Sequence, residues 1–450
     1  MKRNFSKSKQ NHHAGNKFGN DSNRTPYSRK NSEPKKAAVR EGQCPVYHKC
    51  SGCQLQNMTY PEQLRWKQGK VERLLGQFGK ISPILGMDTP YHYRNKVQAA
   101  FGMTRDRKVI SGIYQSTTHR IVPVDRCMIE DEKADEIIVS IRKLMTDFKF
   151  QAYDPYSGKG FLRHVLVKRG FQTGQIMVVF VTVSPIFPAK RNFVNALLKL
   201  HPEITTVVMN VNTTDTGLLL GERQIVLYGP GYIEDILCGC VFRISARSFY
   251  QINPVQTELL YTKAMEFAEL TGTQRVLDTY CGIGTIGLIA AQKAAQVVGV
   301  EVNQEAVRDA VVNAKLNHAD NIRFYHADAG EFMEALAEEE EPVDVVFMDP
   351  PRAGSDQRFL KSVVTLSPKK VVYISCNPET QARDLKYLAA HGYSVKKIQP
   401  VDMFPHTNHV ETVCLLSKLN AKQHIEINLD MDELDLTDAE KKATYQEIKD

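Results

Sequence analysis

The stretch QRVLDTYCGIGTIG at residues 274–287 joins an apolar strand to a glycine-rich loop. The three glycines of this loop let the backbone approach a nucleotide before a helix begins. The next apolar run, residues 297–301, ends in Glu301, an acid placed to bind a ribose diol. Strand and helix patterns alternate from about Arg243 onward, which predicts an α/β fold with a Rossmann-like, doubly wound domain. A glycine loop followed by an acid would also suit a nicotinamide dinucleotide.

Two further apolar strands of this region end in side chains that can do chemistry. One ends in Met348-Asp349-Pro350-Pro351-Arg352, and a later one ends in Ile374-Ser375-Cys376-Asn377-Pro378. Ligands of open α/β sheets bind at the carboxyl ends of the strands, so we expect Asp349, Cys376 and the glycine loop to meet at one site. Asp-Pro-Pro-Arg has no part in hydride transfer. An acid with prolines at this strand end is common in methyltransferases that use S-adenosylmethionine.

Charge is concentrated at the two ends of the chain. The 450 residues carry a formal net charge of +7, but residues 1–43 hold eleven Lys and Arg against three acids, and residues 420–450 hold four against nine. The basic arm cannot bury a core and is predicted to be disordered, with a role in either solubility or RNA contact. The acidic C-terminal tail has no assigned role. The start of the chain is polar and no uncharged run approaches ~18 residues, which predicts a cytoplasmic protein without a membrane partner.

Four of the nine cysteines form a group of their own. Cys44, Cys50 and Cys53 lie close together among loop-forming residues, and Cys127 follows much later. An odd cysteine count without an export signal argues against a disulfide framework. Four thiolates could hold zinc or an iron–sulfur cluster, and three clustered ligands with one distant ligand favour the cluster only slightly. Four protein ligands would close the site, so no activation of a substrate is expected there.

Between Tyr91 and about Phe242 the alternating pattern gives way to short β-like runs. These runs, at residues 96–101, 160–169 and 175–181, predict an antiparallel sheet. Basic residues alternate there with apolar and aromatic ones, as on a sheet face that meets phosphates and stacks bases, although a solvated face gives the same pattern. The basic residues are Arg94, Lys96, Arg105, Arg107, Arg163, Lys168 and Arg169.

The predicted domain organisation has four parts. Residues 1–43 are the basic arm, and residues 420–450 are the acidic tail. An α+β central domain, which would carry the cysteine site and bind RNA, comprises residues 44–62 and 95–248. The Rossmann-like domain comprises residues 63–94 and 249–419.

Several motifs in a fixed order resemble the RNA uracil-C5 methyltransferases, and in particular the iron–sulfur group that modifies 23S ribosomal RNA. The similarity runs from Cys44 to about Leu416, and its motifs are specific only in combination. They are the four cysteines, Ser248-Phe249-Tyr250-Gln251-Ile252-Asn253, the glycine loop, Asp-Pro-Pro-Arg, Ser-Cys-Asn-Pro and Phe404-Pro405-His406-Thr407-Asn408-His409-Val410-Glu411-Thr412. Many ribosomal RNA members begin with a small RNA-binding β-barrel, which this sequence lacks before its first cysteine. The choice of uridine therefore stays open.

The resemblance implies a covalent mechanism and two cofactors. Cys376 corresponds to the nucleophile that adds to carbon 6 of uracil, and Glu411 to the base that removes the proton from carbon 5. Taken alone, either could be a packing cysteine or a surface acid. The residues implied for S-adenosyl-L-methionine are Gln251, Tyr280, Thr285, Glu301, Asp328 and Asp349. The residues implied for a 4Fe-4S cluster are Cys44, Cys50, Cys53 and Cys127.

Three functions follow as hypotheses. The first is methylation of a uridine in 23S ribosomal RNA by a monomeric enzyme. The second is the same reaction on a loop uridine of transfer RNA, which would use every catalytic residue. The third is a non-catalytic, redox-responsive RNA-binding protein, against which the intact Cys376, Glu411 and glycine loop argue. A target uracil must leave its stack to reach Cys376, so we expect it in a loop or bulge.

Overall fold

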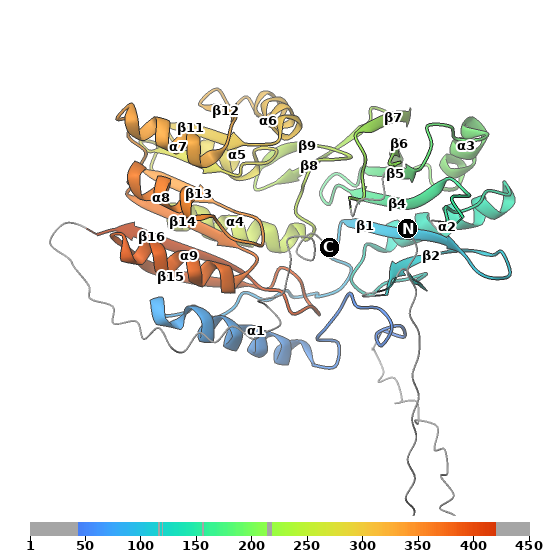
Figure 1. Cartoon of the computed structure of the whole chain (residues 1–450), viewed down its shortest axis with the longest axis horizontal. Helices are drawn as coiled ribbons and strands as arrows, with labels where there is room; N and C mark the ends of the chain where they lie inside the picture. Colours follow the sequence, from blue (N-terminus) through green and yellow to red (C-terminus); the bar gives the residue numbers. More distant parts are fainter. Residues whose placement is uncertain (1–43, 116–117, 119, 155–156, 214–217, 420–450) are drawn as a thin grey trace, which may run out of the picture. The chain divides into compact units, whose positions relative to one another are not determined.

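The computed structural model describes residues 44–115, 118, 120–154, 157–213 and 218–419. The basic arm and the acidic tail predicted from the sequence lie outside these residues. Two seven-stranded sheets form the framework of the described part (Figure 1). Within that part, none of the helices is both long and apolar enough to cross a membrane.

The sheet built by the C-terminal half, here called the doubly wound sheet, has the strand order β12-β11-β10-β13-β14-β16-β15. Neighbouring strands are parallel from β12 to β14, and β16 is inserted antiparallel between β14 and β15. The glycine loop follows the central strand β10, so the predicted α/β doubly wound domain is confirmed. The strands are β10 (Arg275–Thr279), β11 (Gln296–Glu301), β12 (Ile322–His326), β13 (Val345–Met348), β14 (Lys370–Ser375), β15 (Tyr393–Val401) and β16 (Glu411–Lys418).

Helices cover both faces of the doubly wound sheet, which explains why its central strands are apolar on both sides. Side chains alternate along β10: Val276 packs with α4 and α5, whereas Leu277 packs with α7, α8 and α9. The helices are α4 (Pro254–Ala268), α5 (Thr285–Ala291), α6 (Gln304–Leu316), α7 (Ala329–Glu338), α8 (Gln357–Leu366) and α9 (Pro378–Ala390).

Helix α1 (Tyr60–Leu75) belongs with this sheet and not with the cysteine segment that precedes it. It begins at a capping box in which Thr59 N donates to the Glu62 carboxylate, and it is followed by the 3-10 helix η1 (Gly76–Phe78). Its Val71 and Leu75 are fully buried in the core with α7, α8 and α9, and the helix runs beside α9 (Figure 1). The predicted domain boundary at residue 62 therefore falls inside α1.

The second sheet, here called the central sheet, has the strand order β3-β2-β1-β4-β5-β6-β7. The expectation of an antiparallel sheet is wrong for one pair, because β5 and β6 are parallel and are joined through helix α3. Helices α2 and α3 cover one face. The elements are β1 (Lys96–Met103), β2 (Val109–Tyr114), β3 (Ile121–Pro123), α2 (Glu132–Asp147), β4 (Leu162–Arg169), β5 (Ile176–Thr182), α3 (Lys190–Leu200), β6 (Ile204–Val211) and β7 (Arg223–Tyr228).

A hairpin of β8 (Tyr232–Leu237) and β9 (Cys240–Ser245) joins the two sheets. Ile233 and Phe242 of the hairpin share one apolar core with Met177 of the central sheet and with α4 and α5 of the doubly wound sheet. The face of the central sheet that α2 and α3 leave free is thus covered by the hairpin and the segment after it. That segment leads directly to Gln251.

Candidate active site

Three residues predicted for the cofactor site lie in a row at the carboxyl edge of the doubly wound sheet. The last paired residues of β10, β11 and β13 lie opposite one another. Tyr280, Glu301 and Asp349 are the final or next residue of these strands, so the parallel register places them side by side. This is the edge at which ligands bind in such sheets.

The register of β14 and β16 places Cys376 opposite Glu411. The last pair of this antiparallel ladder is Ser375 with Thr412, and Cys376 and Glu411 are the next residues outward. Glu411 is close enough for its charge to raise the pKa of the Cys376 thiol, after burial. Cys376 is half-buried, and Glu411 is only 4% exposed. The structure therefore brings together the thiol and the carboxyl group that the sequence singled out.

Burial sets the charge state of the two carboxyl groups of this site. It raises the pKa of Asp349 to about 7. It raises the pKa of Glu411 to about 8, with the charge of Asp349 adding to the effect and that of Arg352 opposing it. Near neutral pH both groups are consequently poised to exchange a proton, which is the property a general base needs.

Arg352 is a site residue that the sequence reasoning missed. Burial, Glu411 and Asp349 raise the pKa of the Cys376 thiol to about 12, while the charge of the Arg352 guanidinium and its hydrogen bond to the thiol act to lower it. The sequence did contain a signal for this residue, because Arg352 is the last member of the Asp-Pro-Pro-Arg motif. Burial and the two carboxyl groups outweigh Arg352, so the pKa of the thiol stays above its ordinary value.

The loop of residues 402–410, which leads into Glu411, is held from several sides. Lys67 of α1 donates to Asp402 Oδ1 at 2.5 Å and to Phe404 O at 2.9 Å, and the side chains of Lys67 and Asp402 are both fully buried. From the cysteine-bearing segment, Leu55 N donates to His406 O at 2.9 Å. These bonds fix the backbone from which Glu411 projects.

The glycine loop and Glu301 are joined by a direct hydrogen bond. Gly282 N donates to Glu301 Oε2 at 3.1 Å, and Gly282 has φ 54°, a left-handed conformation that glycine adopts without strain. Beneath the loop, Gly287 N donates to Asp278 Oδ2 at 2.7 Å. Burial raises the pKa of Asp278 to about 8. The loop is thus tied to the strand before it and to the acid after it.

Tyr261 of α4 brings together three residues predicted for the cofactor site. Burial and the charge of Asp349 raise the pKa of its hydroxyl, and the side chains of Gln251 and Thr285 are close enough to act in the opposite direction. Tyr261 is 2% exposed. Sequence reasoning missed this residue, because it lies inside an ordinary helix with no motif to mark it.

Tyr280 and Asp328 occupy the other side of the glycine loop. Tyr280 has φ 60°, and its ring lies 5.0 Å from that of Phe359, centroid to centroid. Asp328 is close enough for its charge to raise the pKa of Tyr280, after burial and Asp356. Asp328 also caps α7, since its Oδ1 accepts from Glu331 N at 3.0 Å, so one of its oxygens is already engaged.

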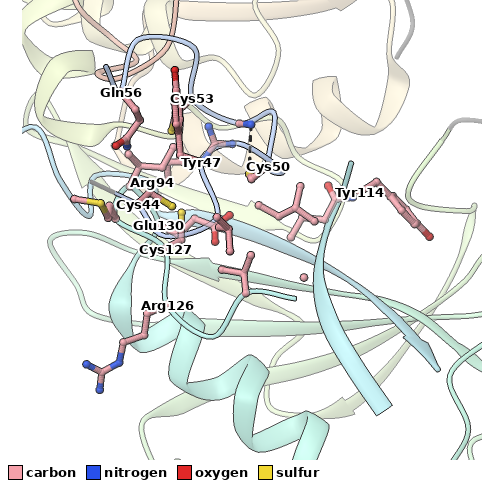
Figure 2. A pocket seen from close by; sticks show the side chains of 18 of the residues that line it. Cys44, Tyr47, Cys50, Cys53, Gln56, Arg94, Tyr114, Arg126, Cys127 and Glu130 are labelled. Carbon is pink, nitrogen blue, oxygen red and sulfur yellow. Dashed lines mark hydrogen bonds between the residues drawn. The ribbon is translucent and has the colours of Figure 1, made fainter. Parts of the chain in front are cut away.

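The four predicted cluster cysteines line one pocket. Its volume is about 330 Å³, and Figure 2 shows Cys44, Cys50, Cys53 and Cys127 around it together with Arg94. All four thiols are free of disulfides and half-buried. Among the described residues, however, no group of three or more His, Cys, Asp or Glu side chains is placed to hold a metal ion. The thiols therefore share a cavity without converging on one point.

Of the seven basic residues predicted to face RNA, one is buried, four are half-buried and two are exposed. Lys168 corrects the prediction, because it is only 5% exposed and points away from solvent. Arg169 pairs with Asp131 at 2.8 Å, and Lys96 lies over the ring of Phe249 at 5.8 Å from its centroid. The exposed members are Arg105 and Arg107.

Comparison with known proteins identifies the family of the chain. Residues 59–419 match the family described as tRNA (Uracil-5-)-methyltransferase. An uncharacterised RNA methyltransferase of Halalkalibacterium halodurans is 44% identical over 385 residues, which cover 84% of this chain and 84% of the relative. Another from Clostridium acetobutylicum is 43% identical over 384 residues, which cover 84% of this chain and 83% of the relative.

A solved structure is similar over most of both chains. It is the Pyrococcus abyssi tRNA (uracil-54, C5)-methyltransferase in complex with S-adenosyl-L-homocysteine, with a TM-score of 0.69 and 30% identity, covering 82% of this chain and 86% of that one. The family match includes Cys127 but begins after Cys53. From the family match and these relatives, we conclude that the chain belongs to the tRNA (uracil-5-)-methyltransferase family and is an RNA (uracil-C5) methyltransferase that uses S-adenosyl-L-methionine.

Proposed function

We propose that this enzyme methylates carbon 5 of a uridine in 23S ribosomal RNA through a covalent bond between Cys376 and the base. The observation that supports the mechanism is that Cys376 and Glu411 lie at the same end of the β14–β16 ladder, one residue beyond its last pair, Ser375 with Thr412. Carbon 5 of uracil is a poor nucleophile, because ring conjugation leaves little electron density there. When the sulfur of Cys376, having lost its proton, bonds to carbon 6, the ring becomes an enolate whose carbon 5 can take the methyl group.

Glu411 completes the reaction by removing a proton. After methyl transfer, carbon 5 carries both the new methyl group and its original hydrogen. The Glu411 carboxylate takes that hydrogen as a proton, the electron pair of the broken bond restores the double bond between carbons 5 and 6, and the bond from carbon 6 to the Cys376 sulfur breaks. One methyl group is transferred and one proton is released in each cycle.

The cofactor residues keep the roles that the resemblance implies, as proposals. Glu301 would accept hydrogen bonds from the ribose hydroxyls, and its bond from Gly282 orients it toward the glycine loop. Asp349 would lie between the methyl donor and the uracil, since it neighbours both Tyr261 and Glu411. The remaining proposed lining residues are Gln251, Tyr280, Thr285 and Asp328.

We further propose a 4Fe-4S cluster at Cys44, Cys50, Cys53 and Cys127. Four free thiols around one cavity form the donor set that such a cluster takes. When bound, the group would link the segment before α1 covalently to the central domain. We derive no catalytic step from it.

The cluster proposal is tested by purifying the protein without oxygen. We expect visible absorption from iron–sulfur charge transfer and about four iron atoms per chain. Cys53→Ser should lose both, whereas the matched control Cys238→Ser, in a half-buried thiol outside the pocket, should keep both. Stoichiometric zinc in colourless, active protein would contradict the proposal.

The choice of RNA is tested with two substrates. The four-cysteine pattern supports ribosomal RNA, whereas the Pyrococcus abyssi relative is a tRNA (uracil-54, C5)-methyltransferase and supports transfer RNA as the second candidate. The enzyme is incubated with S-adenosylmethionine and, separately, unmodified 23S ribosomal RNA and bulk transfer RNA, and 5-methyluridine is mapped by nuclease digestion and mass spectrometry. Product in ribosomal RNA alone supports the proposal, and product only in transfer RNA overturns the substrate but keeps the mechanism.

A further inference from the structure

Lys168 is a buried lysine outside the catalytic site, and burial lowers its pKa to about 7. It lies on β4 and is 5% exposed, yet the described residues place no carboxylate in a salt bridge with it. Its ammonium instead donates to two backbone carbonyls, Ser245 O at 2.9 Å and Ser248 O at 2.8 Å. A buried ammonium is costly unless its hydrogen bonds are satisfied. A leucine or methionine at this position would avoid the cost of burying a charged group. We therefore expect the lysine to have a function that an apolar side chain could not serve.

Residues 245–248 form a turn that is also held from the opposite side. Ser248 Oγ donates to Asp309 Oδ2 of α6 at 2.7 Å and accepts from Ser245 N at 2.8 Å. Lys168 belongs to the central sheet and Asp309 to a helix of the doubly wound sheet. The turn is therefore hydrogen-bonded to both halves of the molecule, through its two carbonyls to Lys168 and through the Ser248 hydroxyl to Asp309.

The backbone that leaves this turn is fixed before it reaches the cofactor side. Asn95, which precedes β1, donates from its side chain to Gln251 O at 3.2 Å and from its backbone to Ile252 O at 2.9 Å. Arg169 N, next to Lys168, donates to Asn95 O at 2.8 Å. The end of the β1–β4 ladder thus holds the segment at 245–248 and again at Gln251 itself, whose side chain is close enough to Tyr261 to act on the pKa of its hydroxyl.

We propose that Lys168 is a positioning residue for the cofactor site, which acts by fixing the turn 245–248 and through it the side chain of Gln251. The inference rests on the proposed role of Gln251 in binding S-adenosylmethionine. According to this proposal, the central domain affects the affinity for S-adenosylmethionine, independently of any contact that it makes with RNA.

The test compares Lys168→Met with the matched control Lys133→Met, an exposed lysine of α2 in the same domain. The dissociation constant for S-adenosylhomocysteine is measured by calorimetry, and kcat and the KM values for S-adenosylmethionine and RNA are measured separately. A misplaced binding group can cost up to about 10²-fold. We expect Lys168→Met to raise the dissociation constant and the KM for S-adenosylmethionine about tenfold, with kcat at saturating cofactor and the KM for RNA nearly unchanged. Lys133→Met should behave like the wild type.

A lysine that served stability alone would lower the melting temperature and leave cofactor affinity of the folded protein unchanged, and that result overturns the proposal. If Lys168→Met does not fold, Ser248→Ala loosens the same turn from the other side and should weaken S-adenosylhomocysteine binding in the same direction. Unchanged affinity in a folded Ser248→Ala variant then overturns it.

The path through Gln251 is tested by a double-mutant cycle. If Lys168 acts through Gln251, the variant with both Lys168→Met and Gln251→Ala should bind no more weakly than Gln251→Ala alone. Additive losses overturn the path. If Gln251→Ala alone leaves affinity unchanged, the proposed function of Gln251 fails, whereas unchanged affinity in Lys168→Met alone makes only the positioning role fail.

Discussion

Replacement of Glu411 by Gln should stop the reaction after methyl transfer and before release of the RNA. The amide keeps the size of the side chain at its buried position opposite Cys376 but cannot accept the proton from carbon 5. The bond between Cys376 and carbon 6 then has no route to break. We therefore expect Glu411→Gln to accumulate a methylated protein–RNA adduct that survives denaturation.

The pH dependence of release in the wild type follows from the pKa of Glu411. Burial, aided by the charge of Asp349, raises this pKa to about 8. Only the ionised form removes the proton, and that form makes up about a tenth of the enzyme at pH 7 and about nine tenths at pH 9. The rate constant for adduct decay should therefore rise about tenfold over this range and level off above it.

The assay is a single turnover with labelled RNA, quenched in denaturant at successive times and resolved by electrophoresis. The matched control is Glu379→Gln, an acid on α9 whose side chain is 47% exposed. That variant should release RNA like the wild type at every pH. Decay of the wild-type adduct that is independent of pH between 6 and 9, or equal decay in Glu411→Gln, would refute the assignment of Glu411 as the base.

Two further changes test the nucleophile and the loop that leads to Glu411. Cys376→Ala should abolish methylation and leave S-adenosylhomocysteine affinity within twofold of the wild type, because the thiol acts on the base and not on the donor; methylation by the variant at a wild-type rate would exclude the covalent mechanism. Lys67→Met should lower the free energy of unfolding by about 3–5 kcal/mol, since it leaves Asp402 buried without its partner. Lys70→Met, which removes only a partly exposed ion pair with Glu379, should cost less than about 1 kcal/mol in the same urea titration, and equal losses would contradict the reasoning.

The strand ends of the doubly wound sheet could be predicted because their signals are local. A parallel strand is predicted to end where an apolar run is followed by glycines, or by Asp349 and two prolines. All such strand ends meet at the carboxyl edge of the sheet. The place of Glu411 could not be found this way. Its position depends on β16 entering antiparallel between β14 and β15, and pairing between strands distant in sequence leaves no local pattern.

Lys168 was misread for a related reason. Alternation along β4 correctly puts Leu166 and Lys168 on one face of the central sheet and Val165 and Val167 on the other, which packs against α2 and α3. Whether a face meets solvent or another part of the chain depends on what docks against it. Here the hairpin β8–β9 and the turn 245–248 cover this face. Lys168 therefore donates hydrogen bonds to backbone carbonyls and does not face phosphates.

The high pKa of the Cys376 thiol is consistent with catalysis once the two halves of the reaction are separated. The thiol must ionise before methyl transfer, while the bound donor carries a positive sulfonium. A positive charge nearby lowers the pKa of a thiol, as Arg352 already does in part. Proton removal by Glu411 comes after methyl transfer, when the donor has become a neutral thioether. The raised pKa of Glu411 therefore bears on the removal of the proton from carbon 5. The raised pKa of Cys376 describes the protein before the positively charged donor binds. A thiol that stays protonated until the donor is bound is also protected from oxidation, because the thiolate is the reactive form.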